Sequence, residues 1–353
     1  MELELDPPQI GEVLVRWEAS GLCHSDEHMR DGTLPVRFPI VGGHEGAGVV
    51  EEVGEGVTRI KPGDHIVCSF LPVCGHCRWC ARGKSYLCDN GALILEGSML
   101  DGTFRFHGGG QDFGALDLLG SFSQRAIVSE SACIRIDDDV PLASAALLGC
   151  GVPTGWGSAV HAGNVQPGDV TVIFGAGGLG HYAIQGARHA GAEFVIAVDP
   201  LAYKQKSALE FGATHAVETA EEAHELVMDL TRGVGADQAV ITMGVAARDV
   251  ISSAFSIIGK GSTVVLTSAS RPEDVNVQLH GLELTMWSKR LQGVVYGAVN
   301  PFEDIPRLLR MYQSGQLKLN ETITREYSLA EVNDGYRDLL AGRNIRGVIR
   351  HEF

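Results

Sequence analysis

The spacing of the cysteine residues gives the clearest indication of chemistry in this chain. Four of the eight cysteines stand close together, at Cys74, Cys77, Cys80 and Cys88. Two-residue gaps let a turning backbone direct successive thiolates at one point, and a fourth thiolate completes a tetrahedron. Four thiolates with no open position are typical of a structural zinc ion, although an iron–sulfur cluster uses the same ligands. The sequence therefore predicts a metal-bound lobe over residues 74–88.

A second set of potential metal ligands lies upstream of this lobe. Cys23 is followed shortly by Asp26, and His44 and Glu45 stand in a glycine-rich run. A catalytic zinc ion takes three ligands of these kinds and keeps one position open for water or substrate. Asp26 is suited to fixing the tautomer of a ligating imidazole. Spacing alone leaves the third ligand open among three other cysteines, Cys68, Cys133 and Cys150.

The middle of the chain has the pattern of a dinucleotide-binding unit. A β-branched and aromatic run at 170–174 predicts a buried strand, a helix is expected over 179–190, and a second strand over 194–198. The turn between the first strand and the helix contains Gly175, Gly177, Gly178, Leu179 and Gly180. Such glycines let a pyrophosphate approach the helix N-terminus. Asp199 follows the last glycine by 199 − 180 = 19 residues, where a carboxylate binds ribose hydroxyls and disfavours the extra phosphate of NADP.

The remaining pattern predicts an α/β protein with two kinds of domain. Helices at 201–211 and 221–231 alternate with strands at 215–217, 238–242 and 263–266, which favours a doubly wound parallel sheet. Before residue 150 the β-prone runs are short and are separated by Gly and Pro turns, at 12–17, 48–53, 65–69 and 123–128. We expect a β-rich domain over 1–151, a nucleotide-binding domain over 152–295, and a return of 296–353 to the first domain.

Composition excludes several classes of partner. The chain has 353 residues with 28 Lys and Arg against 44 Asp and Glu, a net charge of −16. Nucleic-acid and anionic-membrane surfaces need a basic patch, so neither is expected as the main partner. No apolar run approaches a membrane span, and the first residues lack the features of a secretory signal. The sequence predicts a cytoplasmic protein with reduced cysteines.

Taken in order, these motifs resemble the zinc-dependent medium-chain alcohol dehydrogenases over nearly the whole chain. The resemblance implies a GroES-like catalytic domain, a Rossmann domain, two zinc ions per chain and NAD. It also implies that Cys23, His44 and Cys150 hold the catalytic zinc, with Glu45 beside it as an occasional ligand. Family members begin with one or two strands before the segment that matches Leu3–Pro8, where this chain starts.

The resemblance further implies the oxidation of a primary alcohol to an aldehyde by hydride transfer to NAD. Ser25 and His28 would relay the proton to solvent, and Phe70 would line the substrate channel. A homodimer or homotetramer is expected. The contacts implied for the cofactor, besides the glycine-rich turn and Asp199, are His24, Thr154, Leu179, Lys204 and Arg346.

Further runs, among them Asp89–Ala92 and Asn344–Ile349, resemble the nitrosoaniline (NDMA)-dependent, mycofactocin-associated alcohol dehydrogenases. This resemblance implies that NAD stays bound and is reoxidised in place by an external redox acceptor. An alternative within the same fold is a thiol-dependent formaldehyde dehydrogenase, which differs only in its pocket. Zinc-free reductases of the superfamily lack the cysteine ligands, and a non-enzymatic zinc- and nucleotide-binding protein would need a broken site.

Overall fold

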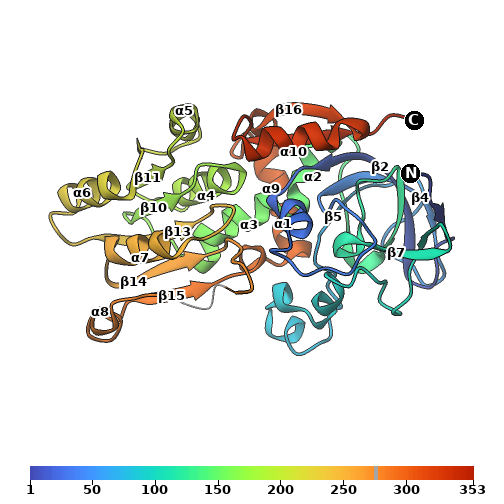
Figure 1. Ribbon diagram of the computed structural model, residues 1–353, viewed down its shortest axis with the longest axis horizontal. Helices are drawn as coiled ribbons and strands as arrows, with labels where there is room; N and C mark the ends of the chain where they lie inside the picture. The colour runs from blue at the N-terminus through green and yellow to red at the C-terminus, as the bar shows by residue number, and fades with distance from the viewer. Residues whose placement is uncertain (274–276) are drawn as a thin grey trace. The chain divides into compact units, whose positions relative to one another are not determined.

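The computed structural model describes residues 1–273 and 277–353. Within these residues the chain divides into two compact units. Unit 1 combines Met1–Gly151 with Asn300–Phe353, and unit 2 comprises Val152–Val299. Figure 1 shows the elements of both. The roles expected for the two units, catalytic and NAD-binding, stay predictions.

Unit 2 contains a parallel sheet in the order β12-β11-β10-β13-β14-β15. The first strand in sequence, β10, has β11 on one side and β13 on the other, so the chain changes direction of winding beside β10. Ligands of doubly wound sheets bind at such a switch point, at the carboxyl ends of the strands. The strands are β10 (Val170–Phe174), β11 (Phe194–Val198), β12 (His215–Val217), β13 (Ala236–Ile241), β14 (Ile258–Leu266) and β15 (Arg290–Gly293).

Both faces of this sheet are covered, as the continuous apolar runs predict. Val172 and Ile196 pack on α6 (Ala220–Leu230) and α7 (Arg248–Ile257). Their neighbours Ile173 and Val195 point the other way and pack with α4 (Gly178–His189) and α5 (Ala202–Glu210). Figure 1 shows these helices beside the strands. The expected doubly wound parallel sheet is confirmed. The predicted boundaries in this unit agree with the observed ones to within two residues, except that β14 begins at Ile258 and not at residue 263.

Unit 1 is built mainly on antiparallel strands, and its C-terminal segment completes the larger sheet; only the pairs β16–β17 and β3–β7 are parallel among the described strands. That sheet has the order β16-β17-β2-β4-β5-β9, with β8 also paired to β2, and a smaller sheet has the order β1-β6-β7-β3. β17 pairs antiparallel with β2. The larger sheet comprises β2 (Glu12–Gly21), β4 (Gly46–Val53), β5 (His65–Cys68), β8 (Arg125–Ser129), β9 (Cys133–Arg135), β16 (Ile323–Ser328) and β17 (Arg346–Arg350). The smaller comprises β1 (Glu4–Leu5), β3 (Ile40–Val41), β6 (Phe106–Gly108) and β7 (Gln111–Ala115).

The sequence pattern does not predict the boundaries of several helices. The first, in the segment His24–Asp31, has few apolar residues, so no apolar period marks it. Among the helices of the described ranges, none has the length and apolar character needed to cross a bilayer. The remaining helices are α1 (His24–Asp31), α2 (Leu142–Ala146), α3 (Gly151–Gly157), α8 (Gly281–Met286), α9 (Pro301–Gln313) and α10 (Val332–Leu340).

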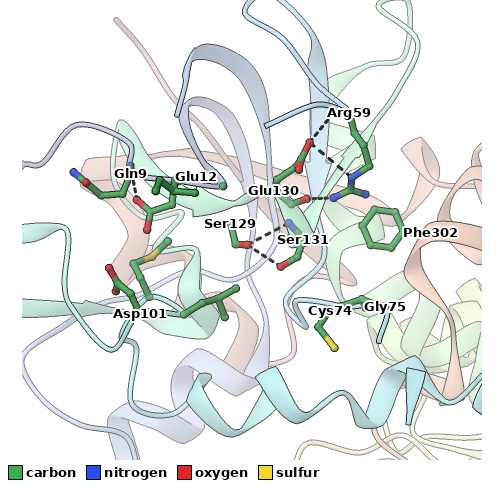
Figure 2. Close-up of a pocket in the computed structure, with 15 residues that line it drawn as sticks. Gln9, Glu12, Arg59, Cys74, Gly75, Asp101, Ser129, Glu130, Ser131 and Phe302 are labelled. Carbon is green, nitrogen blue, oxygen red and sulfur yellow. Dashed lines mark hydrogen bonds and ion pairs between the residues drawn. The ribbon is translucent and has the colours of Figure 1, made fainter. Parts of the chain in front are cut away.

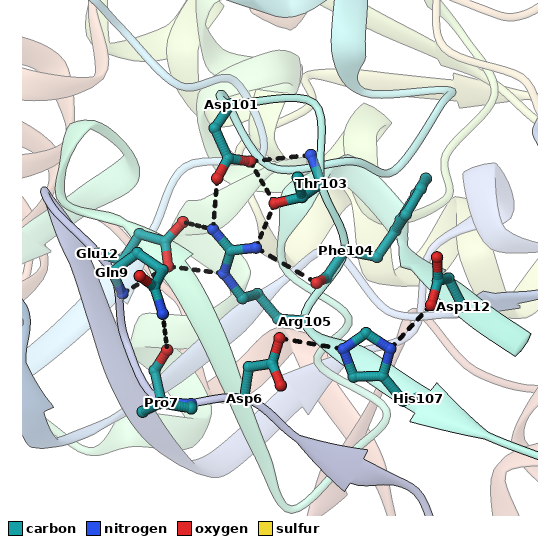
Figure 3. Close-up of polar contacts among 10 residues, drawn as sticks. All are labelled: Asp6, Pro7, Gln9, Glu12, Asp101, Thr103, Phe104, Arg105, His107 and Asp112. Carbon is teal, nitrogen blue, oxygen red and sulfur yellow. Dashed lines mark hydrogen bonds and ion pairs between the residues drawn. The ribbon is translucent and has the colours of Figure 1, made fainter. Parts of the chain in front are cut away.

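A buried arginine ties the start of β2 to the loop that follows the cysteine lobe. Arg105 is 5% exposed and donates to both carboxylate oxygens of Glu12, at 2.9 and 2.7 Å. It also donates to Asp101 at 2.8 Å, as Figure 3 shows. A buried charge is tolerated when it is paired in this way. The contacts fix the loop at 101–105 against the larger sheet.

Candidate active site

Unit 1 brings four potential metal ligands together at a buried point. One ligand atom from each of Cys23, His44, Glu45 and Cys150 lies within 4.8 Å of the others, and all four residues are buried. Cys23 stands between β2 and α1, His44 and Glu45 immediately precede β4, and Cys150 follows the turn Leu147–Gly149. Of the three cysteines left open by spacing, the structure brings Cys150 to the cluster. Cys68 and Cys133 instead face each other, with sulfurs 4.0 Å apart.

Two glycines make this convergence sterically feasible. A Cβ at Gly21 would lie 1.9 Å from Oε2 of Glu45, so a side chain there would displace the carboxylate. Gly43 has φ +87°, and a Cβ there would lie 2.6 Å from the backbone nitrogen of Phe122. A residue with a side chain would be strained in that conformation. These glycines let the segments that carry Cys23 and His44 approach closely.

The electrostatics of the cluster favour a bound cation. The side-chain hydrogen bond with Cys150 lowers the pKa of Cys23 well below its ordinary value, and the same bond raises the pKa of Cys150 well above it. Burial lowers the pKa of His44, but the charge of Asp26 and then that of Cys23 outweigh burial and raise it well above its ordinary value. The sulfurs of Cys23 and Cys150 thus share one proton through their hydrogen bond. A dipositive ion bound to both sulfurs would take the place of that proton. Two sulfurs and one imidazole nitrogen fit Zn²⁺ with a fourth position open.

Glu45 is held by its own partners. Its Oε1 accepts a hydrogen bond from the backbone of Gly151 at 2.9 Å, and its Oε2 pairs with the buried guanidinium of Arg346. Burial raises the pKa of Glu45 to about 7, while Arg346 acts in the opposite direction. Arg346 also donates to the carbonyl of Leu22 at 3.2 Å. Its implied contact with pyrophosphate stays a prediction.

Two buried carboxylates stand behind His44. Oδ2 of Asp26 lies 3.1 Å from Nδ1 of His44, which leaves Nε2 for a metal. Oδ2 of Asp117 lies 4.0 Å from the same nitrogen. Burial raises the pKa of Asp117 to about 7, although the charge of His44 acts to lower it. Asp26 lies where the sequence predicts it, whereas the place of Asp117 is not predicted, because a single Asp in an apolar run carries no spacing signal.

The predicted relay residues lie on or next to α1. The hydroxyl of Ser25 lies 3.7 Å from the sulfur of Cys23. His28 is 5% exposed and its ring centroid lies 6.2 Å from that of the exposed His24. Phe70 presents its edge to the ring of His44, with centroids 6.2 Å apart. Ser25 and Phe70 therefore lie beside the buried cluster, and the roles of all four stay predictions.

The cysteine lobe forms a second, more exposed group of ligands. One sulfur each from Cys74, Cys77, Cys80 and Cys88 lies within 4.8 Å of the others. Backbone N–H groups donate to these sulfurs, as from Cys77 to Cys74 at 3.2 Å and from Cys74 to Cys88 at 3.3 Å. The N–H of Cys80 is the largest of the influences that lower the pKa of Cys77 to about 6. These sulfurs fit a tetrahedral ion with no open position.

A surface hollow of about 870 Å³ lies against this lobe (Figure 2). It is lined in part by Cys74, Gly75 and Phe302. Its Arg59 donates to the backbone carbonyl of Glu130 and stacks 4.6 Å from the ring centroid of Phe302. None of Cys23, His44 and Cys150 lines it. The hollow is therefore separate from the buried cluster of Cys23, His44, Glu45 and Cys150.

In unit 2 the glycine-rich turn has the form that the sequence predicts. Gly175 has φ +94°, and a Cβ at Gly180 would lie 1.9 Å from the carbonyl oxygen of Gly175. The turn leads directly into α4, whose N-terminus favours negative charge. Asp199 is 5% exposed and accepts hydrogen bonds from the backbones of Ala176 at 2.9 Å and Leu201 at 3.0 Å. A carboxylate has about four acceptor positions, so positions remain for ribose hydroxyls.

Further predicted cofactor contacts lie in unit 2, whereas His24 and Arg346 lie in unit 1. Gly177 is the N-cap of α4, and Gly178 and Leu179 begin that helix. Thr154 on α3 is buried, and its carbonyl accepts a hydrogen bond from Ser158 at 2.7 Å. Lys204 lies on α5 and is half-buried. Their contacts with a nucleotide stay predictions.

Known proteins match this chain along its length. Residues 9–138 match the alcohol dehydrogenase GroES-like domain, and residues 178–314 match the zinc-binding dehydrogenase family. A relative from Amycolatopsis methanolica named NDMA-dependent alcohol dehydrogenase is 57% identical over 350 residues, which are 99% of this chain and 94% of the relative. The chain belongs to the zinc-dependent medium-chain alcohol dehydrogenases.

Further alcohol dehydrogenases support this placement. A putative alcohol dehydrogenase D from Mycobacterium tuberculosis is 56% identical over 99% of this chain and 95% of its own. The crystal structure of benzyl alcohol dehydrogenase from Acinetobacter calcoaceticus has a TM-score of 0.92 at 29% identity, covering 99% of this chain and 94% of that one. The predicted family, its fold class and an oxidoreductase activity are confirmed. As a member of this family the chain is an enzyme.

Proposed function

We propose that this enzyme oxidises a primary alcohol to an aldehyde by hydride transfer to NAD, with two zinc ions per chain. The observation that carries the proposal is the convergence of Cys23, His44 and Cys150 at one buried point, with Glu45 held by other partners. The names of its relatives add support, because two that are 57% and 56% identical to this chain are called alcohol dehydrogenases. The cysteine lobe supplies the donors for the second, structural ion.

Each residue of the cluster has a distinct task in this proposal. A zinc ion held by Cys23, His44 and Cys150 supplies a Lewis acid that lowers the pKa of the alcohol hydroxyl. Asp26 keeps the proton of His44 on Nδ1, so that Nε2 can face the ion. Ser25 takes up the hydroxyl proton of the substrate as it gives its own proton onward to the relay, and His28 releases a proton to solvent. Phe70 provides an apolar wall against the imidazole.

NAD is the cofactor that unit 2 supports. The glycine-rich turn offers backbone N–H groups at the N-terminus of α4 for the pyrophosphate. Asp199 repels the additional phosphate of NADP. Asp199→Gly should reduce the preference for NAD over NADP by at least about tenfold, or roughly 1.4 kcal/mol. The ratio of kcat/KM for the two cofactors measures this, and an unchanged ratio contradicts the assignment.

We also propose that NAD stays bound between turnovers and that the enzyme is a homodimer or homotetramer. The relative named NDMA-dependent alcohol dehydrogenase supports reoxidation in place by an external acceptor. Protein purified without added nucleotide should then release about one NAD per chain on denaturation. An empty site contradicts tight binding. Light scattering gives the number of subunits.

A panel of primary alcohols, each assayed with NAD alone and with NAD plus a nitrosoaniline dye, tests the central proposal. The expected result is aldehyde formation that depends on the dye. Turnover of formaldehyde only in the presence of a small thiol would favour a thiol-dependent formaldehyde dehydrogenase. No turnover of any primary alcohol by protein with full zinc content would contradict the proposed substrate class.

A further inference from the structure

The hydroxyl of Tyr336 on α10 is a buried polar atom with no role in the reaction described above. It has no hydrogen-bond partner among the described residues, and neither has Oδ2 of Asp26 on α1, which lies beside His44 without a well-aligned hydrogen bond. Buried polar atoms in native proteins are almost always hydrogen-bonded. We infer that the Tyr336 hydroxyl donates a hydrogen bond to Asp26 and thereby positions this carboxylate against His44. Tyr336 is then a positioning residue for a metal ligand.

Asp26 has room for this third partner. Its Oδ1 accepts a hydrogen bond from the backbone of Gly43 at 2.7 Å, and its Oδ2 lies 3.1 Å from Nδ1 of His44. An ionised carboxylate has about four acceptor positions, so Oδ2 can accept from both the imidazole and a hydroxyl. Gly43 fixes one end of the carboxylate, and Tyr336 fixes the other.

The ring of Tyr336 is held in a cluster that joins the C-terminal helix to the ligand segments. It packs against an apolar cluster that includes Leu22, which directly precedes Cys23. It also meets the ring of Phe122 edge-on, with centroids 6.2 Å apart. A Cβ at Gly42 would lie 3.1 Å from the Phe122 ring and 3.7 Å from Oδ1 of Asp26. Glycine at position 42 therefore lets the Phe122 ring come close to the carboxylate.

The hydroxyl is in the right protonation state to donate. Burial raises the pKa of Tyr336 well above its ordinary value, and the charge and hydrogen bond of Asp26 raise it further. The hydroxyl therefore keeps its proton at neutral pH. With its carboxylate fixed, Asp26 holds the His44 proton on Nδ1 and leaves Nε2 directed at the metal.

This inference rests on the proposed zinc site, and zinc release tests it. We compare wild type with Tyr336→Phe, which removes only the hydroxyl. The matched control is Tyr327→Phe, because Tyr327 belongs to the same apolar cluster but donates to Asp338 at 2.9 Å. Zinc release to a chromogenic chelator should show one phase for the buried cluster and one for the cysteine lobe, so that the lobe is an internal standard.

Tyr336→Phe should release the zinc of the buried cluster about threefold to tenfold faster, since outer partners of metal-bound histidine affect metal affinity by tenfold or more. The lobe phase should be unchanged, and Tyr327→Phe should match wild type in both phases. The visible absorption of cobalt substituted at the buried cluster should also shift in Tyr336→Phe alone. A merely structural role for the ring would leave that spectrum unchanged.

A double-mutant cycle shows whether Tyr336 acts through Asp26. If it does, Tyr336→Phe should add no further acceleration to Asp26→Asn. Additive effects, an unchanged release rate in Tyr336→Phe, or equal acceleration in Tyr327→Phe would each overturn the inference alone. Wild-type protein that holds zinc in the lobe but none at Cys23, His44 and Cys150 would overturn the proposed function, and with it the inference.

Discussion

The two ligand clusters of unit 1 differ in how they are assembled. Cys74–Cys88 places four sulfurs within fifteen residues, where short turns and backbone N–H groups organise them. The buried cluster instead brings together Cys23, His44 and Cys150. The first and the last of these are more than one hundred residues apart in the sequence. In the lobe, a bound ion would fix the conformation of the loop through its ligand atoms. In the buried cluster, the folded sheet fixes the positions of the ligand residues.

This difference matches the chemistry proposed for each cluster. The lobe has four thiolates and no open position, so an ion there can only stabilise the local chain. The buried cluster has three proposed metal ligands, and a fourth potential ligand, Glu45, is engaged with Arg346. Carboxylates behind His44 orient its imidazole. A ligand set built on a folded core can keep one coordination position open without losing its geometry.

The largest contrast between the clusters is expected on removing one ligand from each. Cys150→Ala should lower kcat/KM by at least about a thousandfold, because the Lewis acid that lowers the pKa of the alcohol is lost. Zinc content should fall from two ions per chain to one, while the folded structure persists. Elemental analysis, circular dichroism and an alcohol assay measure the three quantities. Retention of both ions would exclude Cys150 as a ligand.

Removing a ligand of the cysteine lobe should lower the stability of the protein more than its activity. Cys77→Ala should release the structural ion and lower the free energy of unfolding by about 3 kcal/mol, since metal binding is coupled to local folding. That loss corresponds to a fall in Tm of about 6–12 °C for a unit of this size. Calorimetry and limited proteolysis at residues 74–88 measure it. A thousandfold loss of activity at full content of the buried ion would contradict the division of roles.

The same contrast explains what could be predicted from the sequence. The lobe was evident from spacing, and the strands of unit 2 were evident from apolar runs such as Val170–Phe174, because in both cases neighbours in sequence are neighbours in space. The third ligand was not, since Cys68, Cys133 and Cys150 are equivalent in spacing and only the resemblance favoured Cys150. Asp117 was missed altogether, because its place behind His44 depends on the loop after β7.

A smaller effect is expected from the residue behind the imidazole. Asp26→Asn should weaken zinc binding at the buried cluster about tenfold to a hundredfold, because the amide presents a donor where Gly43 or His44 needs an acceptor. Zinc affinity in competition with a chelator measures this. The lobe has no carboxylate in a corresponding position among its described hydrogen bonds, and its affinity should not change. Equal weakening of both sites would indicate a general loss of folding.

The smallest expected effect on stability comes from an ion-pair contact in the smaller sheet, away from both cysteine-containing clusters. His107 on β6 lies 3.1 Å from Asp6, which follows β1, and 2.9 Å from Asp112 on β7, as Figure 3 shows. Hydrogen bonds with Asp6 and then Asp112 raise the pKa of His107 above its ordinary value. The two ion pairs of protonated His107 therefore stabilise the fold fully below about pH 6.5, and this stabilisation is lost as pH rises through the raised pKa of His107. Because the imidazole is partly exposed, it amounts to about 0.5 kcal/mol.

His107→Gln should remove this pH dependence, so urea unfolding at pH 6 and pH 9 should show wild type losing about 0.5 kcal/mol more than the variant. Metal binding at either cluster should give a pH dependence of stability with the opposite sign. Acid protonates the thiolates and releases the ion, so the stabilisation by the metal falls as pH falls. Zinc content measured at each pH separates the two contributions. If the stability of the variant and that of wild type change with pH in parallel at constant zinc content, the charge of His107 does not stabilise the pairing of β1 with the smaller sheet. Metal ligation is then the stronger explanation of any pH dependence of stability.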